Sequence, residues 1–257
     1  MIFIAYHPCY ELELPRGHRF PMDKYPMLRK QLIYEGTFSN ENFFEPKKID
    51  RNIVEKVHNK TYVQKLLTLS LNKSEIRRIG FPLNKRLIDR EMTIAGGTLE
   101  CCIKAFENGI SLNVAGGTHH AFSNKGEAFC LLNDQAIAAQ YLINEYKLKK
   151  ILIIDLDVHQ GNGTAEIFRK NKKVFTFSMH GEKNYPFQKT RSDLDVDLLD
   201  GTEDQQYLDI LNEKLNIIFD KIKPEFIFYL AGVDILKTDK LGRLSLTLEG
   251  CRLRDEI

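Results

Sequence analysis

The chain has 257 residues, of which 43% are hydrophobic and 28% are charged, a composition that is typical of a globular protein and argues against general disorder. Its 37 basic and 35 acidic side chains give a formal charge of +2, so we expect no direct nucleic-acid partner, because such proteins carry a concentrated positive field. No apolar run is long enough for a membrane span, and no secretory signal pattern opens the chain. We therefore expect a soluble, cytoplasmic protein with five reduced cysteines.

Short runs of β-branched and aromatic residues recur along the chain and predict strands. They are Ile2–Ala5, Ile110–Ala115, Lys150–Ile154, Val174–Ser178 and Phe226–Leu230. Each run is nearly continuous rather than alternating, which is typical of strands that are buried on both faces of a parallel sheet.

The segments between these runs carry apolar residues at three- and four-residue spacing, which predicts helices. They are Asp23–Tyr34, Tyr62–Leu69, Leu87–Glu107, Ala136–Tyr146 and Gln206–Lys221. Asn133 or Asp134 can cap the fourth helix, and Thr202–Gln205 has the pattern of a capping box for the fifth. Strands alternating with helices predict one α/β domain over residues 1–257 with a mainly parallel sheet, in which ligands bind beyond the carboxyl ends of the strands.

Four of the seven histidines and three aspartates follow predicted strands directly. They are His119, His120, His159, His180, Asp155, Asp157 and Asp234. Because the carboxyl ends of parallel strands meet at one edge of a sheet, we expect these side chains to lie together.

Asp157 and His159 predict a metal site, because residues i and i+2 of an extended segment point the same way. Asp234 would supply a third ligand, and three protein ligands with an open position are typical of catalytic zinc. The oxygen-rich set also suits Fe(II), Co(II) or Mn(II), so the identity of the metal stays open. Taken alone, Asp157 could instead cap a helix, and His159 could be a hydrogen-bonded core residue.

His119 and His120 follow Gly116-Gly117, where small residues allow a ligand to approach the backbone closely. Two imidazoles beside a metal-bound water could divide the roles of general base and general acid. Asp155 and Asn162 are candidates for orienting them. Asp155, together with Ser178 and loop carbonyls, could also bind a monovalent cation, or it could simply cap its own loop.

Four motifs occur in one order along the chain: GGTHHAF (Gly116–Phe122), AFCLLND (Ala128–Asp134), DLDVHQGNGT (Asp155–Thr164) and AGVDIL…DKLGRLSLT (Ala231–Thr247). Together they resemble the histone deacetylase superfamily, from about Pro15 to the last residue. The DVHQGNG motif, with Gln160, is most similar to class IV deacetylases and their bacterial relatives. The resemblance implies the arginase–deacetylase fold, a three-layer α/β/α arrangement.

The resemblance also implies a zinc-dependent amidohydrolase that acts on the linear amide of an acylated lysine of a protein or of another acylated amine. The residues that match the family's zinc ligands are Asp157, His159 and Asp234. The residues that match its catalytic histidines and their partners are His119, His120, Asp155 and Asn162. The matches to its structural potassium site are Asp155, Ser178 and Met179, and those to its acyl-lysine tunnel are Ala128, Phe129 and Tyr185. The acyl chain length and the oligomeric state stay open.

The sequence departs from the family at one catalytic group. A tyrosine after a glycine-rich turn donates a hydrogen bond to the developing oxyanion in the family, and these 257 residues contain no GGxY. The chain stops at Ile257 within a predicted helix, so we expect a domain that is cut short, from a fragment or a natural variant. Loss of one oxyanion donor should slow the reaction about 10²–10³-fold. The alternative function is therefore a catalytically impaired module that binds zinc or acyl-lysine.

Overall fold

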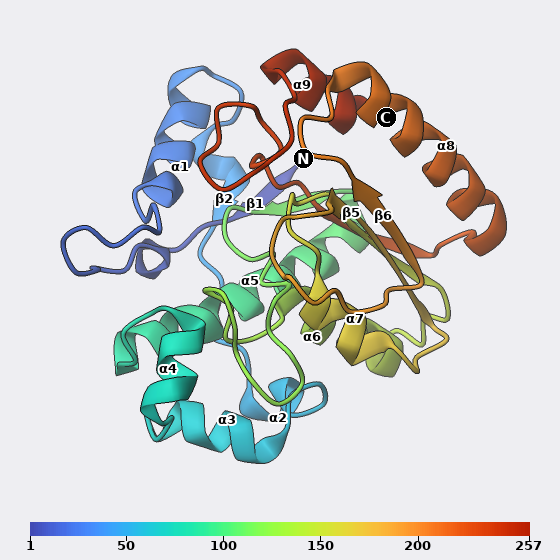
Figure 1. Cartoon of the computed structure of the whole chain (residues 1–257). Coiled ribbons are helices and arrows are strands. Elements are labelled where there is room, and N and C mark those ends of the chain that lie inside the picture. The colour runs from blue at the N-terminus through green and yellow to red at the C-terminus, as the bar shows by residue number, and fades with distance from the viewer. The chain divides into compact units, whose positions relative to one another are not determined.

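The strands pair in parallel and form two separate sheets in a computed structural model, which describes residues 1–257. The chain divides into two units, Met1–Tyr141 and Leu142–Ile257, and each unit holds one sheet. Figure 1 shows the course of the chain from the N-terminus to the C-terminus. Parallel strands with flanking helices confirm the predicted α/β fold class.

The sheet of the first unit has the order β2-β1-β3. Its strands are β1 (Phe3–Ala5), β2 (Phe43–Phe44) and β3 (Ser111–Asn113). Helix α5 (Lys85–Asn108) packs against β1 and β3. The Asn84 side chain accepts a hydrogen bond from the Leu87 N–H to begin this helix, and Gly109, at φ +84°, ends it.

Short helices complete the first unit, and four of them were not predicted. The elements are η1 (Pro8–Tyr10), α1 (Lys24–Tyr34), η2 (Asn40–Asn42), α2 (Arg51–Val54), α3 (Lys60–Leu67) and α4 (Lys73–Ile79). Helices α2 and α4 are too short for an apolar period to show in the sequence. A capping box nevertheless opens α4, where Asn72 and Glu75 exchange side-chain and backbone hydrogen bonds.

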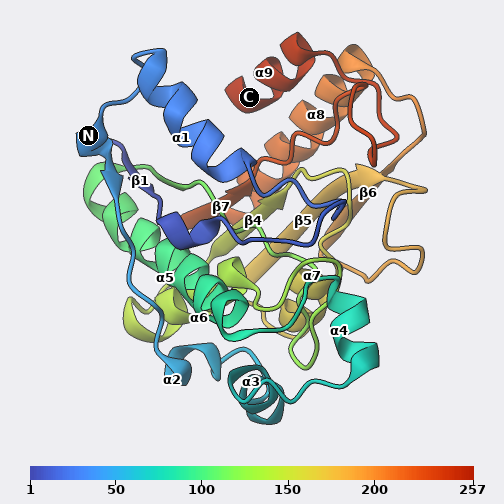
Figure 2. The same ribbon diagram turned by 90° about the vertical axis from the view of Figure 1, so that its left-hand side faces the viewer.

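The sheet of the second unit has the order β6-β5-β4-β7, and Figure 2 shows these strands side by side. They are β4 (Ile151–Asp155), β5 (Val174–Gly181), β6 (Leu194–Leu198) and β7 (Phe226–Leu230). Every residue of β4 is buried. Helix α8 (Asp204–Ile222) packs Tyr207, Leu211 and Ile218 into a cluster with Leu152 of β4.

Three further helices connect or close these elements. Helix α6 (Asp134–Glu145) begins in the first unit and ends in the second. Helix α7 (Asn162–Phe168) follows β4, and α9 (Leu248–Glu256) contacts α8. None of the helices combines the length with the apolar composition that crossing a membrane requires.

Three local expectations differ from the structure. The strands do not share one sheet but pair as two. Strand β7 is not buried on both faces, because it lies at a sheet edge and exposes Ile227 and Tyr229. The capping box at Thr202–Gln205 does not form. Thr202 donates its hydroxyl to the Leu199 carbonyl instead, because Glu203 is the residue before the first turn of α8.

His58 fixes the irregular segment that follows β3 in the first unit. The ring is 1% exposed, and its Nε2 accepts a hydrogen bond from the Asn133 N–H at 3.0 Å. The proton is therefore on Nδ1, which donates to the Phe122 carbonyl at 3.0 Å. Burial lowers the pKa of His58 to about 4, against the opposing effect of its backbone hydrogen bonds.

We predict that His58 makes the protein less stable in mild acid. Its pKa of about 4 in the folded chain lies below the ordinary value of 6.5, so its contribution is complete above pH 6.5 and is lost as the pH falls toward 4. At about 1.4 kcal/mol per pKa unit, the loss approaches ~3 kcal/mol. Urea unfolding between pH 7 and 4.5 should show a smaller loss for His58→Gln than for the natural chain. Equal losses in the two proteins would refute this role for His58.

Candidate active site

Asp157, His159 and Asp234 come together beyond the carboxyl ends of two paired strands in the second unit. Strands β4 and β7 end at Asp155 and Leu230, which are partners in the sheet register. One ligand atom from each of the three residues lies within 4.8 Å of the others. His159 Nδ1 is 2.9 Å from Asp157 Oδ1 and 3.2 Å from Asp234 Oδ2. The strand-end pattern in the sequence therefore brings an imidazole and two carboxylates to one point.

A turn, rather than an extended strand, aligns Asp157 with His159. The residues after β4 form bends, and Asp157 Oδ1 accepts a hydrogen bond from the His159 N–H at 2.8 Å. Such a bond from an aspartate to the backbone two residues later is an Asx turn. The two side chains therefore converge as the i, i+2 spacing predicts, but on a turn rather than on an extended segment. Asp157 is also not a helix cap, since α7 begins only at Asn162.

The charges in this cluster are strongly coupled. Burial raises the pKa of Asp234, and the nearby Asp157 carboxylate raises it further. Burial alone would lower the pKa of His159, but its hydrogen bonds to Asp157 and Asp234 outweigh burial and raise it to about 10. A positive charge at this point is therefore strongly favoured, whether a proton on the imidazole or a metal ion provides it.

The backbone at Gly232 lies so close to the cluster that it leaves no room for a side chain. A Cβ atom added to Gly232 would lie 2.6 Å from Asp157 Cα and 2.8 Å from Asp157 Oδ2. The Val158 N–H donates to Asp234 Oδ1 at 3.0 Å, which fixes the second carboxylate relative to the turn. One imidazole nitrogen and two carboxylates, held in this way, form a donor set that fits zinc or Fe(II).

The residues of the predicted potassium site lie on the neighbouring strand pair. Asp155 of β4 and Ser178 of β5 are register partners, and Met179 follows on β5. Asp155 Oδ1 accepts the Asp157 N–H at 3.2 Å, so it caps its own loop, while cation binding remains a prediction. His180 lies inside β5 rather than after it, and its buried ring contacts Ser178 Oγ at 2.9 Å and Asp197 Oδ1 at 3.0 Å.

His119 and His120 belong to the first unit, in the loop after β3. Both are 5% exposed, and their ring centroids are 4.1 Å apart. Asp134, at the start of α6, shapes the turn in front of them, because its carboxylate accepts hydrogen bonds from the Thr118 N–H at 2.9 Å and the Thr118 hydroxyl at 2.6 Å. Gly116, at φ +106°, allows this approach, since a Cβ there would lie 2.5 Å from Asp134 Oδ2.

Asn133 and Asp134 were predicted only as alternative helix caps, and the structure gives them different roles. Asn133 is the cap, since its Oδ1 accepts the Ala136 N–H at 3.0 Å. Asn133 Nδ2 also donates to the Ala121 carbonyl at 3.2 Å, beyond the histidine pair. Asp134 holds the preceding turn. Adjacent side chains therefore fasten both ends of the histidine segment, a role that depends on tertiary contacts and leaves no signal in the local sequence.

Ala128 and Phe129, the predicted tunnel residues of the first unit, have an unusual backbone. Their φ angles of +45° and +66° lie in the left-handed region, which alanine and phenylalanine rarely adopt. Hydrogen bonds from Ala128 N–H to the Arg78 carbonyl and from Phe129 N–H to the Ile79 carbonyl hold this conformation. The half-buried Phe129 ring packs near Phe20, with centroids 5.2 Å apart. Strained backbone of this kind is common at functional sites.

The other predicted residues of the second unit lie close to the metal-ligand segment in sequence or in space. Asn162 is 2% exposed at the start of α7, and its Oδ1 accepts the Gly163 N–H at 3.0 Å. Tyr185 is partly buried, and its carbonyl accepts the Gln160 N–H at 3.3 Å. In the sequence, Gln160 is only part of the DVHQGNG motif that resembles class IV deacetylases. In the structure, its backbone contacts Tyr185, one of the predicted tunnel residues.

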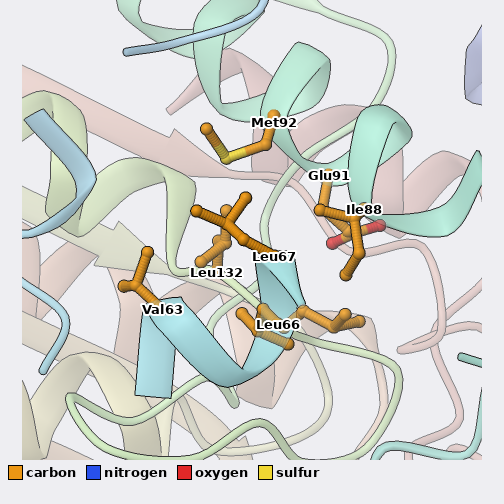
Figure 3. A pocket seen from close by; sticks show the side chains of 8 residues that line it. Val63, Leu66, Leu67, Ile88, Glu91, Met92 and Leu132 are labelled. Carbon is orange, nitrogen blue, oxygen red and sulfur yellow. The ribbon is translucent and has the colours of Figure 1, made fainter. Parts of the chain in front are cut away.

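A small pocket in the first unit lies apart from all of these residues. Helix α3, helix α5 and the loop before α6 line it, as Figure 3 shows. Its only polar lining side chain is Glu91, to which the buried Arg90 guanidinium donates. Burial raises the pKa of Glu91, and the Arg90 charge opposes this effect. An apolar pocket with its one carboxylate already paired offers no group for catalysis.

In parallel α/β folds ligands bind beyond the carboxyl ends of the strands, which is where the imidazole and the two carboxylates of this chain meet. Residues 18–256 match the histone deacetylase domain, and the chain belongs to the histone deacetylase family. This membership supports a deacetylase-type hydrolase.

Three relatives show the range of the similarity. The chain is 43% identical to an uncharacterized protein of Picosynechococcus sp., covering 99% of this chain and 85% of the relative. It is 28% identical to Histone deacetylase 2 of Arabidopsis thaliana, with 99% and 69% covered. It is 30% identical to a probable deacetylase of Archaeoglobus fulgidus, with 86% and 65% covered.

Solved structures confirm the predicted three-layer fold. An HDAC homologue in complex with SAHA superposes with a TM-score of 0.87 at 22% identity, over 99% of this chain and 74% of that one. An HDAC homologue from Aquifex aeolicus gives a TM-score of 0.86 at 22% identity over the same shares, 99% and 74%.

We predict that Asp134→Asn destabilises the first unit. The carboxylate accepts hydrogen bonds from Thr98, Gly117 and Thr118, and an amide would turn a donor toward these donors. Leaving such buried groups unpaired should lower the free energy of unfolding by about 1–3 kcal/mol in urea titrations. Asp23→Asn is the matched control, because the exposed Asp23 side chain makes no cap hydrogen bond. Similar losses in the two variants would contradict the role given to Asp134.

Proposed function

We propose that this chain is a zinc-dependent amidohydrolase that cleaves the amide of an acylated lysine in a protein, or of another acylated amine. The observation that carries the proposal is the convergence of Asp157, His159 and Asp234 within 4.8 Å in a member of the histone deacetylase family. Fe(II) is the alternative metal, because two of the three ligands are carboxylates.

Asp157, His159 and Asp234 would hold the metal through two carboxylates and one neutral imidazole. When bound, zinc polarises the amide carbonyl and lowers the pKa of a coordinated water. His159 would bind the metal through Nδ1 in its neutral form, so metal binding would displace any proton from the nitrogen that contacts Asp157 and Asp234. The close approach of Gly232 supports this role, because a side chain at that position would collide with Asp157 and Asp234.

His119 and His120 are assigned the proton transfers of the reaction. One imidazole would remove the proton of the attacking water, and the other would donate a proton to the departing amine. Asp155 and Asn162 are assigned to orient the two rings, a carboxylate holding an imidazolium more strongly than an amide does. The burial of the pair, 5% exposed at each ring, supports the proposal, because it would strengthen such hydrogen bonds.

Ala128, Phe129 and Tyr185 are assigned to the acyl-lysine tunnel. Flat aromatic walls suit the apolar four-carbon stem of a lysine, and the strained backbone at Ala128 and Phe129 supports a constrained, functional position. Asp155, Ser178 and Met179 are assigned to a structural potassium ion, which the facing register of Asp155 and Ser178 supports.

We predict that zinc-loaded protein hydrolyses a fluorogenic acetyl-lysine peptide and that a chelator abolishes this activity. Asp234→Asn should lose both bound zinc and turnover, because it removes one of two carboxylate ligands. His120→Ala should retain one zinc per chain but lose about 10²–10⁴ in rate, the usual contribution of general acid–base catalysis. Rates and metal content are measured on the same preparations by fluorescence and by elemental analysis.

The control for His120→Ala is His7→Ala, whose ring accepts a hydrogen bond from the Cys9 N–H at a short helical turn. The control should keep the natural rate. Activity that survives chelation, or that is equal in His120→Ala and the control, would overturn the proposal. Binding of zinc and of an acyl-lysine peptide without turnover would overturn the hydrolase and leave the binding module described by the alternative function.

A further inference from the structure

Gln160, the residue after the metal-ligand candidate His159, makes an unusually complete set of side-chain hydrogen bonds. It is 1% exposed. Its Nε2 donates to the Thr190 carbonyl at 2.6 Å and to Asp195 Oδ1 at 2.8 Å, and its Oε1 accepts the Thr190 N–H at 2.8 Å. The amide thus satisfies both backbone groups of Thr190 at once, as a strand neighbour would.

The backbone of Gln160 holds the same loop at a second point. Its N–H donates to the Tyr185 carbonyl at 3.3 Å. One buried residue therefore fastens both ends of residues 185–190, which have no regular secondary structure. Because Gln160 follows His159 directly, it connects this loop to the metal-ligand segment.

The loop that Gln160 holds presents aromatic side chains. Phe187 is 90% exposed, and its ring centroid lies 6.4 Å from that of Tyr185. Within the loop, Lys189 Nζ donates to the Asn184 carbonyl at 2.6 Å and to the Pro186 carbonyl at 2.9 Å. Because the Phe187 side chain is exposed, hydrophobic burial does not fix its position. The hydrogen bonds of Lys189 and Gln160 are the contacts that hold the backbone of the loop.

We infer that Gln160 is a positioning residue that sets the place of Tyr185 and Phe187 relative to the metal-ligand segment and thereby determines binding of the acyl-lysine side chain. The inference rests on the proposed function for the role of the substrate. Only an amide supplies the two donors and one acceptor that Thr190 and Asp195 require. A glutamate at this position would lack both donors and would face the Asp195 carboxylate.

The experiment uses the absence of tryptophan from the sequence. Phe187→Trp adds a single fluorophore to the loop, and Gln160→Leu and Gln160→Glu are made in this background. We expect both to lower the fluorescence anisotropy of Trp at 187, while zinc content stays at that of the parent. With an acetyl-lysine peptide, KM should rise about 10-fold, which corresponds to about 1.4 kcal/mol of binding free energy, while kcat changes much less.

The matched control is Gln206→Leu, an exposed glutamine of α8 in the same unit, which should change neither signal. Adding Asp195→Asn to Gln160→Glu should restore part of the anisotropy and of KM, because it removes the facing carboxylate. Anisotropy and KM that stay at parent values in Gln160→Leu would overturn the inference, as would a fall in kcat and zinc content that matches the change in KM.

Failure of the proposed function gives a different result. In that case both the natural chain and the parent Phe187→Trp protein show no hydrolysis at all, and the anisotropy of the Gln160 variants still decides whether this residue positions the loop.

Discussion

Two carboxylates and one imidazole are held within 4.8 Å of each other beyond the ends of β4 and β7, and the surrounding structure keeps them there. Burial and the nearby Asp157 carboxylate raise the pKa of Asp234, so a positive charge beside the two carboxylates would stabilise their ionised forms. The fully buried β4 fixes the start of the turn, the Asx bond of Asp157 sets its shape, and Gly232 permits the close approach of the second chain segment. These three residues form a set that could hold a metal ion, and the proposed function rests on this set.

The irregular segments that carry the remaining functional candidates depend on buried polar side chains rather than on secondary structure. Asn133 and Asp134 hold the two ends of the histidine segment, and the neutral ring of His58 bonds to Phe122 and Asn133 within the same region. In the second unit, Gln160 does the same for the loop of Tyr185. These bonds are buried or partly buried, and the loss of a partner costs most where the group is buried. The conformation of the segments that carry these candidates therefore depends on residues outside the proposed site.

The sequence predicted the elements whose signal is long or continuous. Helix α5 and strands β4 and β7 match their expected ranges to within about two residues, because periodicity and apolar runs report directly on burial. Strand β6 was not predicted, because aspartates alternate with the apolar residues in its sequence, LDVDL, and leave no continuous apolar run. The convergence of the three metal-ligand candidates follows from the strand-end rule. The roles of Asp134 and Gln160 could not be predicted, because each depends on a partner whose position only the tertiary structure defines.

Zinc K-edge X-ray absorption on the protein loaded with one equivalent of zinc tests the central claim most directly, because the chain offers both a His/Asp/Asp set and five cysteines as competing ligands. We predict a first shell of nitrogen and oxygen only, at about 2.0–2.2 Å, with the multiple-scattering signature of one imidazole. The spectrum of Asp234→Asn should differ from that of the natural chain. A sulfur shell at about 2.3 Å, or a spectrum that Asp234→Asn leaves unchanged, would show that zinc binds elsewhere.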